Sequence, residues 1–391
     1  MASVNNHRLL LFTRKETTVL MNDTSWMDRS LALARQARLL CPPNPAVGCV
    51  LVSAQGELIG EGHTQATGHA HAEVMALRDA RAKGHTTQGA TAYVTLEPCV
   101  HQGRTGPCCD ALVTAGVKQV VASLEDPNPQ VAGQGFARLR AAGIEVVVGP
   151  GAAESRELNL GFFSRMVRKT PWVRMKVAAS LDGKTALPNG ASQWITSSEA
   201  RADGHAWRAQ ACAVLTGIGT VTSDDPRLDV RLATTPRQPQ LVVVDSRLET
   251  PLNAQLFMPG RALTMYAAVT DEAKQAALQA QGAQVIYKPE TQADARHKVD
   301  LAAMLQDLAA REINEVHVEA GHKLNGSLIR AGLVDEFLIY LAPKLLGQGA
   351  DMASFGPLTA LSQAVALEFK STQMLGPDLR ILARVQGRDL F

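Results

Sequence analysis

Residues 71–108 read HAEVMALRDARAKGHTTQGATAYVTLEPCVHQGRTGPC, and this stretch decides the fold of the N-terminal half. Apolar side chains recur at helical spacing over 71–82, which predicts a helix there. Residues 91–96 are rich in β-forming side chains and predict a strand. A second helix is expected over 108–115. A helix, a strand and a helix in this order are typical of an α/β domain.

The flanking sequence extends the same alternation. An amphipathic helix is expected over 25–40, beginning at a capping box formed by Ser25 and Asp28. Prolines in 41–45 end that helix, because proline cannot continue it. The other expected elements of this half are strands at 47–52, 119–123 and 144–148 and a helix at 136–142. This rhythm predicts a mostly parallel sheet with helices on both faces.

A second α/β unit is expected after Gly149-Pro150-Gly151. A connecting helix at 153–167 leads to Lys169-Thr170-Pro171, which opens a new set of strands. The expected strands are 172–178, 213–216, 240–245, 263–266, 315–318 and 336–341, alternating with helices such as 199–209 and 271–281. The predicted division is a disordered extension at 1–20, a first domain at 21–150, a connecting helix at 151–169 and a second domain at 170–391. Met21 is an alternative start.

Composition excludes several classes of protein. The formal net charge is +2, from 39 basic and 37 acidic residues, and no basic stripe is present, so we expect no nucleic-acid partner. No run of 18 apolar residues occurs, so we expect no membrane span. The apolar patch at 9–12 is too short for a secretory signal. Five of the six cysteines lie in the first third of the chain, which favours metal binding or buried thiols in a cytoplasmic protein over a disulfide framework.

One histidine and two cysteines form a candidate zinc site. His71 stands where a helix begins, Cys99 follows a strand, and Cys108 lies nine residues further on. Three such ligands leave the fourth position of a tetrahedral zinc open for water, which distinguishes a catalytic from a structural site. Zinc lowers the pKa of that water from about 15.7 to roughly 7. Glu73 is then expected to move protons, as the non-ligating glutamate does in zinc deaminases.

Other readings of these cysteines remain open. Cys109 adjoins Cys108 and is a rival ligand, whereas Cys41 and Cys49 are expected to be buried thiols or pocket walls. The loop between Cys99 and Cys108 is long, and we expect His101, Arg104 and Thr105 to contact substrate, with Arg104 at a phosphate; a solvated loop is the alternative.

These motifs resemble the bifunctional riboflavin-biosynthesis family, in which diaminohydroxyphosphoribosylaminopyrimidine deaminase is joined to 5-amino-6-(5-phosphoribosylamino)uracil reductase. The resemblance runs from about Trp26 to the end and rests on residues 43–48, 71–73, 95–108 and 126–129 in the first half. In the second half it rests on 176–183, 192–196, 215–231 and 321–327. It implies an N-terminal cytidine-deaminase-like three-layer α/β/α domain and a C-terminal dihydrofolate-reductase-like α/β domain.

The resemblance also implies roles for individual residues. It assigns zinc to His71, Cys99 and Cys108 and proton transfer to Glu73, and its spacing prefers Cys108 over Cys109. The NADPH contacts it implies are Ala178, Trp194, Thr220, Asp224 and Ser246, with the phosphates at Gly321, His322, Lys323, Leu324, Asn325, Gly326 and Ser327. The substrate contacts it implies in the reductase are Ser192, Arg208, Leu228, Arg231 and Glu319. Family members form homo-oligomers, so an oligomer is expected here.

The residues alone support part of this assignment. Glu319-Ala320-Gly321 follows an expected strand, and Asn325-Gly326-Ser327 is expected to open a helix whose free N–H groups suit a phosphate. A plain strand–helix turn explains the same pattern. Where the family has proline and glycine, this chain has Gly106 and Ala320. Lys176 and Asp224 are candidates for the general acid of the reduction.

The predicted function is therefore deamination of 2,5-diamino-6-(5-phosphoribosylamino)pyrimidin-4-one, followed by NADPH-dependent reduction of its ribosyl group to a ribityl chain. One alternative is a zinc deaminase of nucleosides with a non-catalytic C-terminal domain. Another is a structural zinc module carrying an α/β binding domain, which the three-ligand pattern disfavours.

Overall fold

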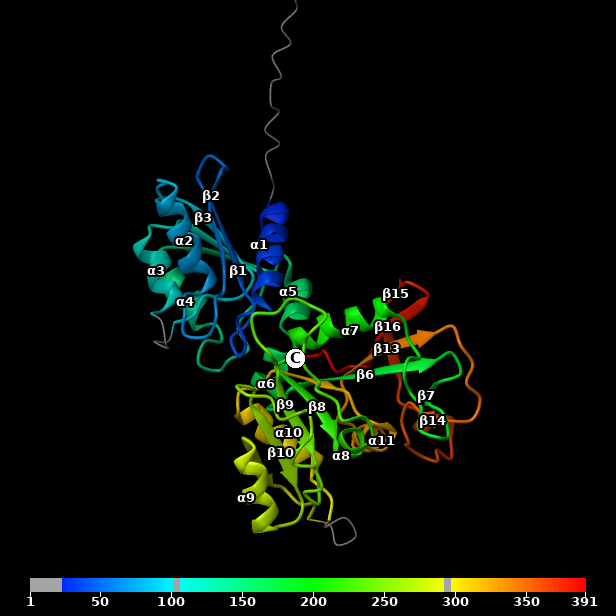
Figure 1. Cartoon of the computed structure of the whole chain (residues 1–391). Helices are drawn as coiled ribbons and strands as arrows, with labels where there is room; N and C mark the ends of the chain where they lie inside the picture. Colours follow the sequence, from blue (N-terminus) through cyan, green and yellow to red (C-terminus); the bar gives the residue numbers. More distant parts are fainter. Residues whose placement is uncertain (1–22, 101–105, 292–296) are drawn as a thin grey trace, which may run out of the picture.

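The computed structural model of the chain describes residues 23–100, 106–291 and 297–391. Two large β-sheets, one in each half of the sequence, are each covered by helices (Figure 1). The extension expected at 1–20 lies outside the described residues. Within the described ranges, no helix is both long enough and apolar enough to cross a bilayer.

The first sheet has the strand order β2-β1-β3-β4-β5. Its strands are β1 (Gly48–Val52), β2 (Leu58–His63), β3 (Thr91–Val94), β4 (Gln119–Ala122) and β5 (Glu145–Val148). β3, β4 and β5 run parallel, whereas β1 pairs antiparallel with both β2 and β3. The expected mostly parallel sheet is therefore mixed at one edge, where a β1–β2 hairpin adds a strand that was not predicted.

Alternate side chains of this sheet are buried on opposite faces. Val50, Tyr93 and Val121 pack against the residues of α1 and α5 on one face. Leu51, Val94 and neighbouring apolar residues pack against three helices on the other face. The helices of the two layers are α1 (Asp23–Ala37) and α5 (Ala152–Leu158), and α2 (Ala72–Ala82), α3 (Cys108–Thr114) and α4 (Gln134–Ala141). The expected three-layer α/β/α fold is confirmed.

Two glycines of β2 bring helix α2 close to the sheet. A Cβ atom on Gly60 would lie 2.4 Å from the carbonyl oxygen of Ala76, and one on Gly62 would lie 2.5 Å from Cβ of Met75. These glycines also explain why the strand was missed, since glycine is depleted in strands and breaks the apolar alternation. The close approach fixes the position of α2, the helix that carries Glu73.

Two helix boundaries differ from expectation. α1 is helical from Asp23, the first described residue, so Ser25 lies inside the helix and does not cap it. The expected single connecting helix is two helices, α5 and α6 (Leu160–Arg168), interrupted at Asn159. The buried Asn159 side chain bonds both backbone groups of Ala46, accepting at 2.7 Å and donating at 3.0 Å. These bonds tie the interruption to the first sheet, 113 residues away in sequence.

The second sheet has the order β11-β10-β9-β8-β12-β6-β13-β16-β15. Its strands are β6 (Trp172–Ser180), β8 (Ala213–Gly217), β9 (Gln240–Val244), β10 (Leu263–Ala267), β11 (Ala283–Tyr287), β12 (Glu315–Val318), β13 (Glu336–Ala342), β15 (Leu367–Leu375) and β16 (Asp378–Val385). All pairs from β11 to β13 are parallel, and β16 and β15 are antiparallel additions at one edge. A small separate sheet pairs β7 (Lys184–Ala186) with β14 (Ala350–Asp351).

Helices cover both faces of the parallel part, which confirms an α/β unit. Apolar residues of α7, α8 and α9 pack on one face, and those of α10 and α11 pack on the other. Their bounds are α7 (Ser198–Gln210), α8 (Ile218–Asp224), α9 (Glu272–Ala280), α10 (Leu301–Ala310) and α11 (His322–Arg330). The carboxyl ends of β9, β8 and β12 are neighbours in this sheet, which is where open parallel sheets bind ligands.

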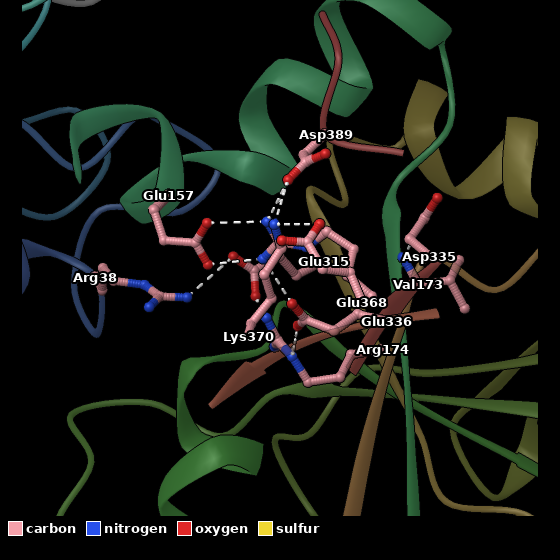
Figure 2. Close-up of polar contacts among 11 residues, drawn as sticks. Arg38, Glu157, Val173, Arg174, Glu315, Asp335, Glu336, Glu368, Lys370 and Asp389 are labelled. Carbon is pink, nitrogen blue, oxygen red and sulfur yellow. Dashed lines mark hydrogen bonds and ion pairs between the residues drawn. The ribbon is translucent and has the colours of Figure 1, made fainter. Parts of the chain in front are cut away.

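A cluster of charged residues joins the two halves (Figure 2). Arg38, after α1, lies 3.2 Å from Glu315 of β12, and Glu315 also pairs with Arg174 of β6 at 3.1 Å. Arg384 of β16 pairs with Glu157 of α5 at 2.7 Å and with Glu336 of β13 at 2.8 Å. The guanidinium groups of Arg174 and Arg384 are buried, and each faces carboxylates that neutralise it.

Candidate functional site

His71, Cys99 and Cys108 come together at the start of two helices. His71 is the N-cap residue of α2, Cys108 is the first residue of α3, and Cys99 lies in the segment that follows β3. His71 Nδ1 lies 3.6 Å from Cys99 Sγ and 3.4 Å from Cys108 Sγ, and all three candidate ligand atoms lie within 4.8 Å of one another. A tetrahedral zinc with bonds of about 2.0–2.3 Å separates its ligands by roughly 3.5 Å. The donor set and its spacing therefore fit zinc.

Local electrostatics favour the thiolate of Cys99, whereas the hydrogen bond to Cys99 and burial raise the pKa of Cys108. The backbone N–H of Cys108 donates to Cys99 Sγ at 3.4 Å. The thiol of Cys108 donates to Cys99 as well, and this bond, with the His71 ring, lowers the pKa of Cys99 to about 4. Helix N-termini carry partial positive charge, which further stabilises a negative sulfur. Cys99 is thus prepared as an anionic metal ligand.

Glu73 lies in the first turn of α2, two residues after His71, and its side chain is buried. Burial raises the pKa of its carboxyl group, and the nearby Cys99 sulfur raises it further. The carboxyl group also interacts directly with the Cys108 side chain. Glu73 therefore faces the cluster and is not a member of the ligand set, the placement that a proton carrier requires.

Cys109 points elsewhere. Its buried thiol donates to the backbone oxygen of Pro98 at 3.1 Å and lies 3.6 Å from that of Gly135. Cys41 and Cys49 are buried as well, and burial raises the pKa of both thiols. Geometry therefore places Cys108, and not Cys109, with His71 and Cys99.

Glu97 is a buried carboxylate that fixes the segment next to Cys99, and no role was predicted for it from the sequence. Glu97, two residues before Cys99, accepts backbone N–H bonds from Asp126 at 3.1 Å, Gly133 at 2.9 Å and Phe136 at 3.1 Å. These bonds fasten the segment between β4 and α4 to the end of β3. The sequence feature that could have indicated this role is a charged residue, Glu97, located between a buried strand and Pro98-Cys99.

A cavity of about 980 Å³ lies along the groove between α2 and α3. Its lining includes Ala70 and Pro107, the residues that directly precede two members of the cluster, and the exposed Arg78 and Arg81. None of its described lining residues belongs to the metal cluster, but the guanidinium groups in the lining suit a phosphorylated molecule. The expected substrate contacts His101, Arg104 and Thr105 lie outside the described residues. Among the described residues, a Cβ at Gly106 would meet nothing within 4 Å.

In the second half, Arg208 and Glu319 form a buried ion pair. Arg208 Nε donates to Glu319 Oε1 at 2.6 Å, and Nη2 donates to Oε2 at 2.9 Å, while Nη1 bonds the backbone oxygen of Asp229. Lys176 Nζ lies 3.8 Å from Glu319, and the buried His317 ring lies 3.6 Å from it. Burial alone would raise the pKa of Glu319, but Arg208 and Lys176 lower it. Because its donors are engaged, Arg208 is better suited to hold Glu319 in place than to bind a phosphate.

Leu228 and Arg231 flank Asp229, whose backbone oxygen accepts a hydrogen bond from Arg208. Arg231 donates to Asp229 Oδ1 at 2.7 Å, yet its side chain is half exposed and keeps donors open to a ligand. Leu228 has a positive φ of 52°, and its backbone oxygen accepts from Arg261 at 2.9 Å. Of the five expected substrate contacts, the structure thus gathers Arg208, Glu319, Leu228 and Arg231. The contacts described for Ser192 do not join it to them.

The expected phosphate turn is largely helical. α11 begins at His322, three residues before the expected start, so Gly321 is its N-cap and Asn325 lies one turn inside. No side chain of the described structure caps this helix, which leaves its first N–H groups to a ligand. Thr220 lies beside Gly321, since a Cβ on Gly321 would be 3.8 Å from its hydroxyl oxygen. Oδ1 of the buried Asn325 has no partner among the described residues.

The remaining expected cofactor contacts are less closely grouped. Ser246 follows β9, and its hydroxyl oxygen accepts from the backbone N–H of Val299 at 3.3 Å. Ala178 lies in β6 opposite Tyr340 of β13, and Asp224 is exposed at the end of α8. Trp194 is 61% exposed, stacks against the Arg201 guanidinium at 4.5 Å, and is not joined to Thr220 or Gly321 by any described contact.

Comparison with known proteins agrees with this two-part description. Residues 20–124 match the family described as cytidine and deoxycytidylate deaminase zinc-binding region, and residues 171–381 match the RibD C-terminal domain. The chain is 44% identical over 375 residues to the riboflavin biosynthesis protein RibD of Escherichia coli, covering 92% of this chain and 98% of that protein. It is 39% identical over 359 residues to RibD of Aquifex aeolicus, with 92% and 97% covered.

Solved structures give the same result. RibD of Acinetobacter baumannii is similar with a TM-score of 0.82 and 39% identity, covering 93% of this chain and 98% of that one. A diaminohydroxyphosphoribosylaminopyrimidine deaminase/5-amino-6-(5-phosphoribosylamino)uracil reductase of Thermotoga maritima is similar with a TM-score of 0.81 and 31% identity, with the same coverage. A deaminase domain and a reductase domain are both present, which favours the bifunctional reading over a non-catalytic second half. The chain therefore belongs to the RibD family of bifunctional riboflavin biosynthesis enzymes.

Proposed function

We propose that the chain deaminates 2,5-diamino-6-(5-phosphoribosylamino)pyrimidin-4-one and then reduces the ribosyl group of the product to a ribityl chain with NADPH. The observation that carries the proposal is the meeting of His71, Cys99 and Cys108 beside the buried Glu73, on the same chain as the Arg208–Glu319 site. The relative from Thermotoga maritima carries both activities in its name.

In the deamination, His71, Cys99 and Cys108 would hold zinc, which supplies Lewis-acid activation of a water at neutral pH when bound. Glu73 takes a proton from the attacking water and passes protons to a ring nitrogen and to the leaving amine. Water replaces the amino group, and ammonia leaves. The burial of Glu73 supports this role because it favours the protonated carboxyl group at the moment of transfer.

In the reduction, a nicotinamide cofactor supplies the hydride. Thr220, Gly321 and the first turn of α11 would hold its phosphates, and Arg231 and Leu228 would contact the substrate. Lys176 is better placed as proton donor than Asp224, because it lies 3.8 Å from Glu319 while Asp224 lies exposed at the end of α8. Arg208 keeps Glu319 ionised and oriented beside it.

The expected setting is the cytoplasm, supported by six cysteines that are all free. We also propose that the chain acts as a homo-oligomer on small molecules and not on nucleic acid.

The test follows ammonia release and NADPH oxidation separately, using purified zinc-loaded protein and the diaminopyrimidine phosphoribosyl substrate. Both signals should appear, with ammonia first, and cytidine should give neither. The Glu319→Gln variant should release ammonia normally but oxidise NADPH slowly. Ammonia release from cytidine, or no oxidation of NADPH with the deaminated product, would contradict the proposal.

A further inference from the structure

A second cavity, of about 660 Å³, lies beside helix α11. Lys323, Ser327 and Arg330 line it from one side of the helix, and Lys298 and Phe355 line it from two other segments. It adjoins the N-terminus of α11, because Lys323 is the second residue of that helix.

The charged side chains described in the lining of this cavity are all positive. Three of its described lining residues are cations, Lys298, Lys323 and Arg330, and none is a carboxylate. Arg330 is anchored, since it donates to the backbone oxygen of Ser354 at 2.7 Å and to the hydroxyl of Ser327 at 3.3 Å. Lys298 and Lys323 are exposed and take part in no ion pair within the described part of the chain. Two ammonium groups are therefore free to meet an anion in one cavity.

Lys298 also lies at the carboxyl edge of the parallel sheet. The next residue, Val299, is buried and donates its backbone N–H to the hydroxyl oxygen of Ser246, directly after β9. The backbone N–H of Ala268, after β10, donates to the carbonyl oxygen of Ser246 at 3.0 Å. These bonds hold the segment that carries Lys298 at the strand ends. The cavity thus runs along α11 from Lys323 to Arg330, and Lys298 lines it from a segment that is bonded to Ser246 after β9.

We propose that Lys298 and Lys323 bind the 2′-phosphate of the adenosine of NADPH and so select the phosphorylated cofactor over NADH. This inference rests on the reductase activity proposed above. A phosphate monoester carries close to two negative charges at neutral pH, and ammonium groups pair with it strongly. NADH lacks this group and would leave the two cations without a partner. Phe355 offers an apolar wall of the kind that an adenine ring requires.

Binding without turnover tests the proposal. Calorimetry on the full chain compares NADP⁺ with NAD⁺, and 2′,5′-ADP with 5′-AMP, for the wild type and for Lys298→Gln and Lys323→Gln. Each substitution should weaken NADP⁺ and 2′,5′-ADP about tenfold or more, the effect of losing one charge-assisted hydrogen bond. Binding of NAD⁺ and 5′-AMP should change by less than about twofold.

Lys274→Gln is the matched control. Lys274 lies at the same sheet edge, with Nζ 3.4 Å from the backbone oxygen of Arg247, but it does not line the cavity. It should leave all four affinities nearly unchanged. Equal weakening of NADP⁺ and NAD⁺ by Lys298→Gln, or no weakening of either, would overturn the inference while leaving the reductase proposal intact. A wild type that binds neither dinucleotide would overturn both.

Discussion

Arg384 and Glu157 form a two-pronged ion pair between the two halves of the chain, with distances of 2.7 Å and 3.1 Å between guanidinium nitrogens and carboxylate oxygens. Arg384 is buried in β16 and also contacts Glu336, whereas the Glu157 side chain remains half exposed on α5. Figure 2 shows Glu157 directed from its helix into the charged cluster that includes Glu336 and Arg174. The arginine thus belongs to the core of one half and reaches the surface of the other.

Removing the buried partner should be far more damaging than removing the exposed one. Arg384→Met leaves Glu336 buried with one arginine fewer, and we expect the free energy of unfolding to fall by about 3–5 kcal/mol. Glu157→Gln should lower it by no more than about 1 kcal/mol, because its carboxylate can be hydrated. Urea denaturation of the two variants checks this, and equal losses would show that burial does not govern the cluster.

The two adjacent cysteines should differ in zinc content. Cys108→Ser removes one of three candidate ligands and should reduce bound zinc, measured by elemental analysis after dialysis, from about one ion per chain to nearly none. Cys109→Ser changes a thiol that bonds Pro98 and lies outside the cluster, so zinc should stay bound. Loss of zinc from Cys109→Ser alone would reverse the assignment.

Acid should destabilise the second half through His205. Burial, with Arg208 and Arg231, lowers the pKa of this ring to about 4, and its Nδ1 accepts from the backbone N–H of Arg231 at 3.3 Å. The unfolded chain binds the proton near pH 6.5 and the folded chain only near pH 4, so stability is lost as pH falls between these values. The loss at this site over that pH range should be about 3 kcal/mol.

Thermal melting of His205→Gln at several pH values measures this effect. Glutamine can still accept the Arg231 bond but gains no charge, so the melting temperature should fall less between pH 7 and pH 5. His317, whose pKa burial lowers to about 3, acts in the same direction and keeps part of the dependence. His85→Gln, at an exposed histidine, should leave the wild-type profile unchanged. An identical profile for His205→Gln would refute the assignment.

Arg208→Lys should slow the reduction without affecting the deamination. Lysine cannot reproduce the two parallel bonds to Glu319, so kcat/KM for NADPH oxidation should fall roughly 10- to 100-fold. Ammonia release occurs in the other domain and should stay within about twofold. Arg237→Lys is the matched control, because the described hydrogen bonds of this side chain go to the backbone oxygens of Gln210 and Ala211.

The sequence predicted those features that depend on local pattern or motif spacing. Strands such as β1 and β9 are short apolar runs, and the metal cluster follows from a histidine at a helix start and cysteines after a strand. β2 was missed because it contains Gly60 and Gly62. These glycines allow α2 to pack closely on the strand, and this contact cannot be recognised from the sequence.

Long-range side-chain contacts could not be predicted. Asn159 divides the connecting helix because its side chain bonds Ala46, 113 residues away in the sequence. The substrate contact expected of Arg208 stays a prediction, but its pairing with Glu319, 111 residues away, was not foreseen. Neither the Asn159–Ala46 contact nor the Arg208–Glu319 contact produces a periodic pattern in the sequence. Each depends on which surfaces pack together in the folded chain.

The most direct test of the account is the pair of activities of Glu73→Gln. Ammonia release from the diaminopyrimidine substrate and NADPH oxidation with the deaminated product are measured on the same zinc-loaded preparation. We predict that ammonia release falls by at least about 100-fold, the scale of losing general acid–base catalysis, while zinc content and NADPH oxidation remain those of the wild type. Ammonia release at the wild-type rate would contradict the assignment of Glu73 and of the centre built around it.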